Sequence, residues 1–78
     1  MIIRFRSVDD VESFLSITQN IRGDVIIGEG NIQVDGKSPM GVMGLDLNKE
    51  YPVFLHEKDD SNESTDFINK ITELGITI

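Results

Sequence analysis

The stretch Asp24–Asp35 carries the sequence DVIIGEGNIQVD, and it decides the fold that we expect for the whole chain. Residues 24–29 and 31–35 predict two strands, the second because its apolar and polar residues alternate, as is typical of a half-buried strand. The pair Gly30-Asn31 predicts a tight turn that joins them. The segments on either side are therefore expected to extend a sheet that begins here.

The segment before these strands predicts a strand followed by a helix. Residues 1–6 place Met1, Ile3 and Phe5 on one face, with the arginines on the other. Ser7 suits the N-cap of the helix, and Asp10 three residues later completes a weak capping box. We expect Gly23 to end this segment. The residues that recur at helical spacing, and so face the core, are Val11, Phe14, Leu15 and Thr18.

A short helix is predicted over residues 38–47. Ser38 is a good N-cap, and Pro39 suits the first helical position, where a missing N–H group costs nothing. Val42 and Leu45 can face the core at i, i+3 spacing. This spacing leaves two residues more outward, Met40 and Met43.

The last part of the chain predicts one more strand and one more helix. Residues 51–57 form the strand, whose two faces carry Val53 and Leu55 on one side and Phe54 and His56 on the other. Ser61 or Asn62 caps the final helix, and Gly75 closes it. The apolar residues of this helix are Phe67, Ile68, Ile71 and Leu74.

The resulting order, β-α-β-β-α-β-α, predicts an α+β fold of the open-faced β-sandwich type. We expect a four-stranded, mostly antiparallel sheet with the helices on one face and water on the other. With 78 residues, the chain is expected to form one domain, residues 1–78.

The composition argues against several classes of partner. Fourteen acidic and seven basic residues give a net charge of -7, which opposes binding to nucleic acid and to anionic membrane surfaces. No apolar run approaches the length of a membrane span, and the N-terminus lacks a signal-peptide pattern. The chain has no cysteine, which suits a reducing, cytoplasmic compartment.

The sequence KSPMGVMGL at residues 37–45 resembles the regulatory-serine region of HPr, the histidine-containing phosphocarrier of the sugar phosphotransferase system. Gram-positive members read KSIMGVMSL there, so this chain differs only at Pro39 and Gly44. The similarity extends over Asp24–Leu74. It implies an HPr-like open-faced sandwich and makes Ser38 the candidate for regulatory phosphorylation. It also implies that partners dock on the short helix, at the positions of Pro39, Met40 and Met43.

The N-terminal third departs from that family where its chemistry resides. HPr carries phosphate on a histidine, followed by an arginine and a proline, at the start of its first helix. Ser7 stands at the histidine position, Asp9 at the arginine and Asp10 at the proline. Two carboxylates at a helix start would repel an arriving phosphoryl group, so we expect the carrier site to be absent. No base is predicted beside Ser7, and no catalytic residue is predicted.

Other candidate sites receive a structural interpretation. His56, the only histidine, is a chemically suitable phosphoryl acceptor or an ordinary surface histidine. The pattern Gly28-x-Gly30 precedes a strand, which disqualifies it as a dinucleotide loop. We predict no metal site and no cofactor, because the spacing of an EF-hand loop is missing from the acidic residues Asp59, Asp60, Glu63 and Asp66.

Three functions follow as hypotheses. The first is a non-enzymatic, HPr-like regulatory or adaptor protein that binds protein partners, including phosphotransferase-system or regulatory proteins, through Ser38–Met43. The second is a phosphocarrier that uses His56. The third is a binding module of the same fold with no tie to sugar transport.

The two methionines of the short helix have two interpretations. Met40 and Met43 fill gaps in the core or form an adaptable contact surface, and the sequence leaves both interpretations open.

Overall fold

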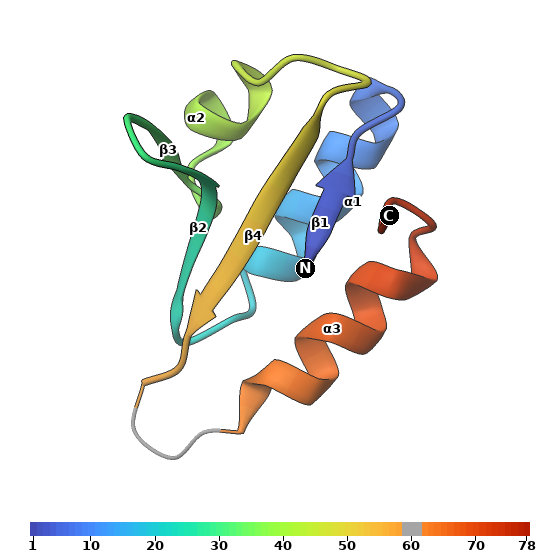
Figure 1. The fold of residues 1–78 in the computed structure, drawn as a ribbon. Helices are drawn as coiled ribbons and strands as arrows, with labels where there is room; N and C mark the ends of the chain where they lie inside the picture. Colours follow the sequence, from blue (N-terminus) through green and yellow to red (C-terminus); the bar gives the residue numbers. More distant parts are fainter. Residues whose placement is uncertain (59–61) are drawn as a thin grey trace.

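The elements follow one another in the predicted order (Figure 1). The computed structural model describes residues 1–58 and 62–78. Its elements are β1 (Ile2–Arg4), α1 (Val8–Thr18), β2 (Asp24–Glu29), β3 (Ile32–Asp35), α2 (Pro39–Met43), β4 (Glu50–His56) and α3 (Glu63–Glu73).

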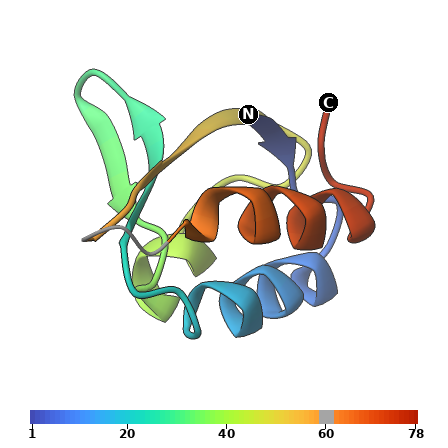
Figure 2. The same ribbon diagram turned by 90° about the horizontal axis from the view of Figure 1, so that it is seen from below.

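One sheet joins the four strands in the order β1-β4-β2-β3, and every neighbouring pair is antiparallel. β2 and β3 meet through the predicted two-residue turn, because Glu29 lies opposite Ile32. The helices lie together under one face of the sheet, and the other face is open (Figure 2). The prediction of an α+β fold with a four-stranded antiparallel sheet and three helices is therefore confirmed for the described residues.

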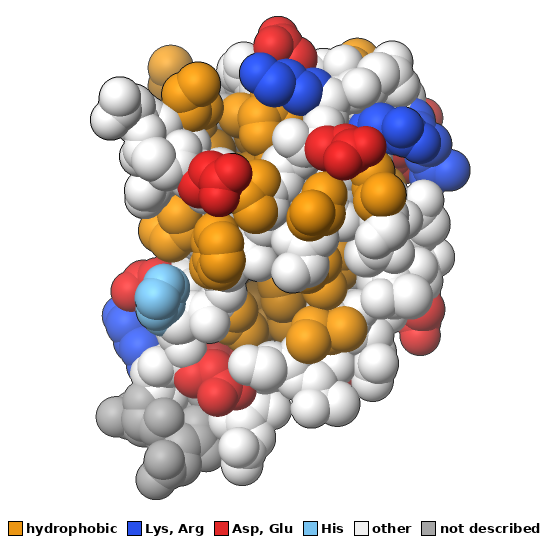
Figure 3. Space-filling view, in the orientation of Figure 1, with side chains coloured by type: hydrophobic (Ala, Val, Ile, Leu, Met, Phe, Trp, Pro, Cys, Tyr) orange, Lys and Arg blue, Asp and Glu red, His pale blue; other side chains and the backbone are white. Residues whose placement is uncertain are grey.

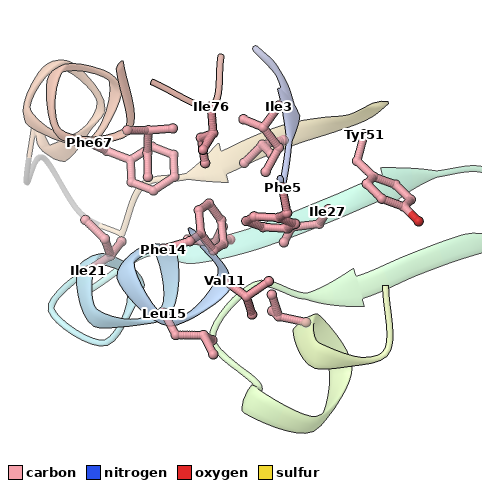
Figure 4. Packing of buried hydrophobic residues seen from close by; sticks show 14 residues of the cluster. Ile3, Phe5, Val11, Phe14, Leu15, Ile21, Ile27, Tyr51, Phe67 and Ile76 are labelled. Carbon is pink, nitrogen blue, oxygen red and sulfur yellow. The ribbon is translucent and has the colours of Figure 1, made fainter. Parts of the chain in front are cut away.

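The core lies between the sheet and the helices and is centred on three aromatic rings (Figure 4). The Phe14 ring of α1 packs edge-to-face against Phe5, at 5.3 Å between centroids, and against Phe67 of α3, at 6.5 Å. Thr18 is also completely buried, and its hydroxyl donates to the carbonyl oxygen of Gly36 at 2.8 Å. The Phe14 ring therefore packs α1 against both α3 and the residue that follows β1.

The predictions for the two ends of α1 are confirmed only in part. Ser7 is the N-cap residue as predicted, but its side chain makes no capping hydrogen bond, and the Asp10 carboxylate accepts from the Arg6 N–H at 2.9 Å. The helix ends at Thr18, well before Gly23. Gly23 is needed for a different reason: a Cβ atom there would collide with the carbonyl oxygen of His56 in β4.

The ends of the other helices agree only in part with the sequence patterns. The short helix ends at Met43, and Leu45 follows it, partly buried. Asn62 is the N-cap residue of α3 without a capping side-chain bond, whereas Ser61 lies outside the described residues. Gly75 closes α3 as predicted, with a φ of 77° that a glycine adopts without strain.

Two features of the strands differ from the predictions. Ile32, which the alternation places on a half-buried strand, is 60% exposed because it lies next to the turn at the edge of the sheet. The C-terminal residues also pair with the side of β1 that faces away from β4. The carbonyl oxygen of Ile76 accepts from the Arg4 N–H at 2.8 Å, and the Ile78 N–H donates to the carbonyl oxygen of Ile2 at 2.9 Å. The chain therefore covers the outer edge of β1 with its own end.

Candidate docking surface

The helix α2 is short, and local capping holds it in place. The Ser38 hydroxyl accepts from the Gly41 N–H at 3.2 Å, and Pro39 occupies the first turn, both as predicted. At the other end, the Gly44 N–H donates to Met40 and the Leu45 N–H to Val42. Capping at both ends compensates for the unpaired backbone groups of so short a helix.

One side of α2 is anchored in the core and the opposite side faces water. Val42 is completely buried, whereas the Met40 side chain is 88% exposed and that of Met43 is 55% exposed. Of the two interpretations of the methionines, the structure thus excludes the filling of gaps in the core. Their i, i+3 spacing places them on one face of the helix.

Met43 also borders a groove between α2 and the start of α1, with a volume of about 240 Å³. Val8 and Val11 of α1 form one wall, and Leu45 and Leu47 of the following loop form the other. We call this feature the α2 groove. It is apolar, and Val8 and Leu47 are themselves exposed large hydrophobic residues, which mark contact surfaces when they lie side by side.

Two hydrogen bonds fix the loop that supplies Leu45 and Leu47. The Asp46 N–H donates to the hydroxyl of Tyr51 at 3.0 Å, and the Asn48 N–H donates to the carbonyl oxygen of Phe5 at 2.7 Å. Since Tyr51 and Phe5 are buried, the loop is attached to the core on both sides of Leu47. The groove is therefore a preformed feature of the surface.

The electrostatics at the start of α1 are set by one ion pair. The Arg6 guanidinium donates to both carboxylate oxygens of Asp10, at 2.8 and 3.0 Å, and to the carbonyl oxygen of Leu74 at 3.1 Å. The hydrogen bond from the Arg6 side chain holds the pKa of Asp10 below its ordinary value. The cation nearest to Ser7 in sequence is thus already engaged, and Asp9 adds a further negative charge to the first turn.

This ion pair makes a prediction about acid stability. Because the pKa of Asp10 is lower in the folded protein, its carboxylate stabilises the fold above the unfolded pKa of about 3.9, and this contribution is lost as pH falls through the folded pKa. We expect Asp10→Asn to have a lower Tm than the unmodified protein at pH 6 and a shallower decline of Tm between pH 5 and pH 3. Asp9→Asn, which leaves the ion pair intact, should retain the original decline. Equal slopes for the unmodified protein and Asp10→Asn would contradict the assignment.

The structure does not bring His56 to this surface. His56 is exposed at the end of β4 opposite Asp24, and Figure 1 shows that end of β4 and α2 at opposite ends of the sheet. Ser7 directly precedes Val8, which lines the α2 groove, but Ser7 itself is not among the lining residues. The structure therefore brings Met43 together with the start of α1 and leaves His56 apart.

The acidic residues near α3 have structural partners. The Glu63 carboxylate accepts from the backbone N–H groups of Arg22 and Gly23, and Asp66 pairs with Lys70 at 3.0 Å. Asp59 and Asp60 lie outside the described residues. Within residues 1–58 and 62–78, no group of three or more acidic, histidine or cysteine side chains could hold a metal ion.

Val8, Leu45 and Leu47 are the groove residues that sequence reasoning missed. Their apolar character is visible in the sequence, but only the tertiary packing of α1 against α2 brings them together.

None of the helices in the described part of the chain has both the length and the apolar composition needed to cross a bilayer. Comparison with protein-family models, curated proteins and solved structures finds no match to the chain.

Proposed function

We propose that the protein is an HPr-like regulatory or adaptor protein, related to the phosphotransferase system, that docks protein partners through residues 38–43 without carrying phosphate. The observation that carries the proposal is the exposed pair Met40 and Met43 beside the apolar α2 groove. Methionine side chains are flexible and polarizable, so such a pair adapts to the surface of a partner. The resemblance of residues 37–45 to HPr supports both the surface and the class of partner, and we place this function in the cytoplasm.

The start of α1 supports the loss of the carrier function. Ser7 stands where HPr has its histidine, and the neighbouring Arg6 is held by Asp10 and the end of α3. A phosphoryl group that approached Ser7 would meet the carboxylates of Asp9 and Asp10. Charge of the same sign disfavours the arriving group in both the ground and the transition state.

Ser38 is our candidate for regulation by phosphorylation. Its hydroxyl lies at the N-cap of α2, next to the docking methionines, and is partly buried. A phosphate adds about 1.5 to 2 negative charges at neutral pH. On Ser38 it would change the charge of the docking surface directly.

A phosphate-transfer assay tests the alternative in which His56 is the phosphoryl acceptor. The His56 side chain is exposed, so a phosphoryl donor protein could reach it. We expect no label when the protein is incubated with labelled phosphoenolpyruvate and the general phosphotransferase enzyme, beside an authentic HPr as the positive control. Acid-labile label that disappears in His56→Ala would overturn the proposal and establish the carrier hypothesis.

Affinity capture from native lysate tests the docking surface. We expect Met43→Asp to lose at least one protein that the unmodified chain retains, because the substitution places a charge at the rim of the α2 groove. Ile78→Asp is the matched control, since Ile78 is 61% exposed and lies at the chain end away from α2. Identical sets of captured proteins for the two variants would contradict the docking role. A captured protein unrelated to sugar transport would favour the third hypothesis.

A further inference from the structure

The strands β1 and β4 differ in length, and this leaves part of β4 without a neighbour. β1 pairs with Glu50, Tyr51 and Pro52, and the Val53 N–H donates to the carbonyl oxygen of Met1 at 2.8 Å. β4 continues to His56, but on this side no strand of the described residues accompanies it (Figure 1).

The backbone groups of Leu55 point into this gap. In an antiparallel sheet, alternate residues of a strand direct their N–H and C=O groups to the same neighbour. The Val53 N–H donates to Met1, so the N–H and C=O groups of Leu55 face the same side as those of Val53. The N–H and C=O groups of Phe54 and His56 face β2. Among the described residues, Leu55 has no hydrogen-bond partner on the β1 side.

A cavity of about 280 Å³ occupies the gap between this edge and α3. Phe54 and Leu55 line it from β4, Phe67 and Ile68 line it from α3, and Met1 closes the end next to β1. Apolar side chains also gather around this part of the open face in the space-filling view (Figure 3). Phe54 and Ile68 are each about half exposed, at 48% and 47%. We call this cavity and the adjoining backbone of Leu55 the β4 slot.

We propose that the β4 slot binds an extended, basic peptide segment of a partner protein, which adds to β4 as a strand lying end to end with β1. The free backbone groups of Leu55 select a strand, because only an extended main chain presents matching donors and acceptors at strand spacing. The apolar walls select apolar side chains at alternate positions of the segment, those that face the cavity. The segment binds apart from the α2 groove, so the proposal does not depend on the docking role of α2.

Charge selects a basic partner over a second copy of this chain. The chain carries a net charge of -7, and Glu57 directly follows β4, where its carboxylate accepts from the N–H of the slot residue Ser64 at 2.8 Å. A second copy would bring seven further negative charges to this surface, whereas lysine or arginine at the water-facing positions of a peptide would be attracted to it. The alternation of apolar and basic residues is thus the expected signature of the segment.

The test uses peptides selected by the intact protein from a library of random heptapeptides. We expect the enriched peptides to alternate apolar and basic residues and to slow hydrogen exchange of the Leu55 amide at least tenfold, with little change at the already paired Val53 amide. Two N-methylated versions of the best peptide, methylated at neighbouring positions, separate edge pairing from simple apolar contact. Only the version methylated on the side that pairs with β4 should bind at least tenfold more weakly.

Protein variants locate the site. Ser64 lines the slot, and Ser64→Trp should abolish binding by filling it. Ile68→Lys, at an exposed rim position, should weaken binding without repacking of the core, because it replaces an apolar wall with a charge of the same sign as the basic residues of the peptide. Met43→Asp, in the α2 groove, should bind as the unmodified protein does. The proposal is overturned by a selection without enriched peptides, by equal binding of the two methylated versions, or by loss of binding in Met43→Asp. A dimer of the free protein that already protects the Leu55 amide would also overturn it and would assign the slot to a second copy.

Discussion

Phe14→Ala is expected to cost about 3–5 kcal/mol of unfolding free energy. The ring is completely buried and contacts Phe5 and Phe67, so its removal leaves a cavity where α1, α3 and the end of β1 meet. A chain of this length has a total stability of roughly 4–12 kcal/mol at the usual value per residue. The variant should therefore lose a large share of its stability, and at the lower end of that range it would be largely unfolded.

Urea unfolding followed by circular dichroism measures this cost. Phe54→Ala is the matched control, because it removes the same ring from a position that is 48% exposed on the open face. We expect the control to lose no more than about 1–2 kcal/mol, as fits a half-exposed side chain. If both variants lost the same amount, the aromatic cluster would not be the centre of the core.

Glu63→Ala is expected to cost about 2–3 kcal/mol through lost hydrogen bonds. Both carboxylate oxygens accept from the Arg22 N–H, at 3.0 and 2.8 Å, and one also accepts from the Gly23 N–H at 2.9 Å. Gly23 is buried, so its N–H group would lose its acceptor in a place that water reaches poorly. The substitution would release the loop between α1 and β2 from the first turn of α3.

Asp66→Ala is the control in the same helical turn. Asp66 is exposed and pairs with Lys70 across one turn of α3, an arrangement that contributes less than about 1 kcal/mol. Thermal unfolding of the two variants under the same conditions should separate them clearly. A Glu63→Ala variant no less stable than Asp66→Ala would contradict the role assigned to the Glu63 carboxylate.

The elements that the sequence predicted correctly are those that local interactions specify. Ser38, Pro39 and the turn at Gly30-Asn31 act within a few residues, and their side chains determine the backbone nearby. The burial of Val42 and the exposure of Met40 follow from helical spacing, which is also local.

The errors concern residues whose role depends on distant segments. A glycine after a helix is explained equally well by a C-cap and by a close approach of two backbones. Only the path of β4 shows that Gly23 is needed for a close approach, to the carbonyl oxygen of His56. Asp10 could cap Ser7, but Arg6 competes for its carboxylate and also reaches the end of α3. The α2 groove likewise combines Val8 with Leu47, which no sequence spacing relates.

The pairing of Ile78 with Ile2 has a consequence for the connectivity of the chain. The N–H of the last residue donates to the second residue at 2.9 Å, so the two chain ends lie side by side. A short linker could therefore join them, and the chain could be opened instead at Gly30, where the turn is exposed and a Cβ atom would meet nothing within 4 Å. Such a circular permutant would start at β3 and place α2 near its N-terminus while every strand kept its neighbours. The α2 part of the docking surface would then be synthesised early and the α1 part late. The surface should still have the same shape, because the packing of α2 against α1 determines it and the position of the chain ends does not.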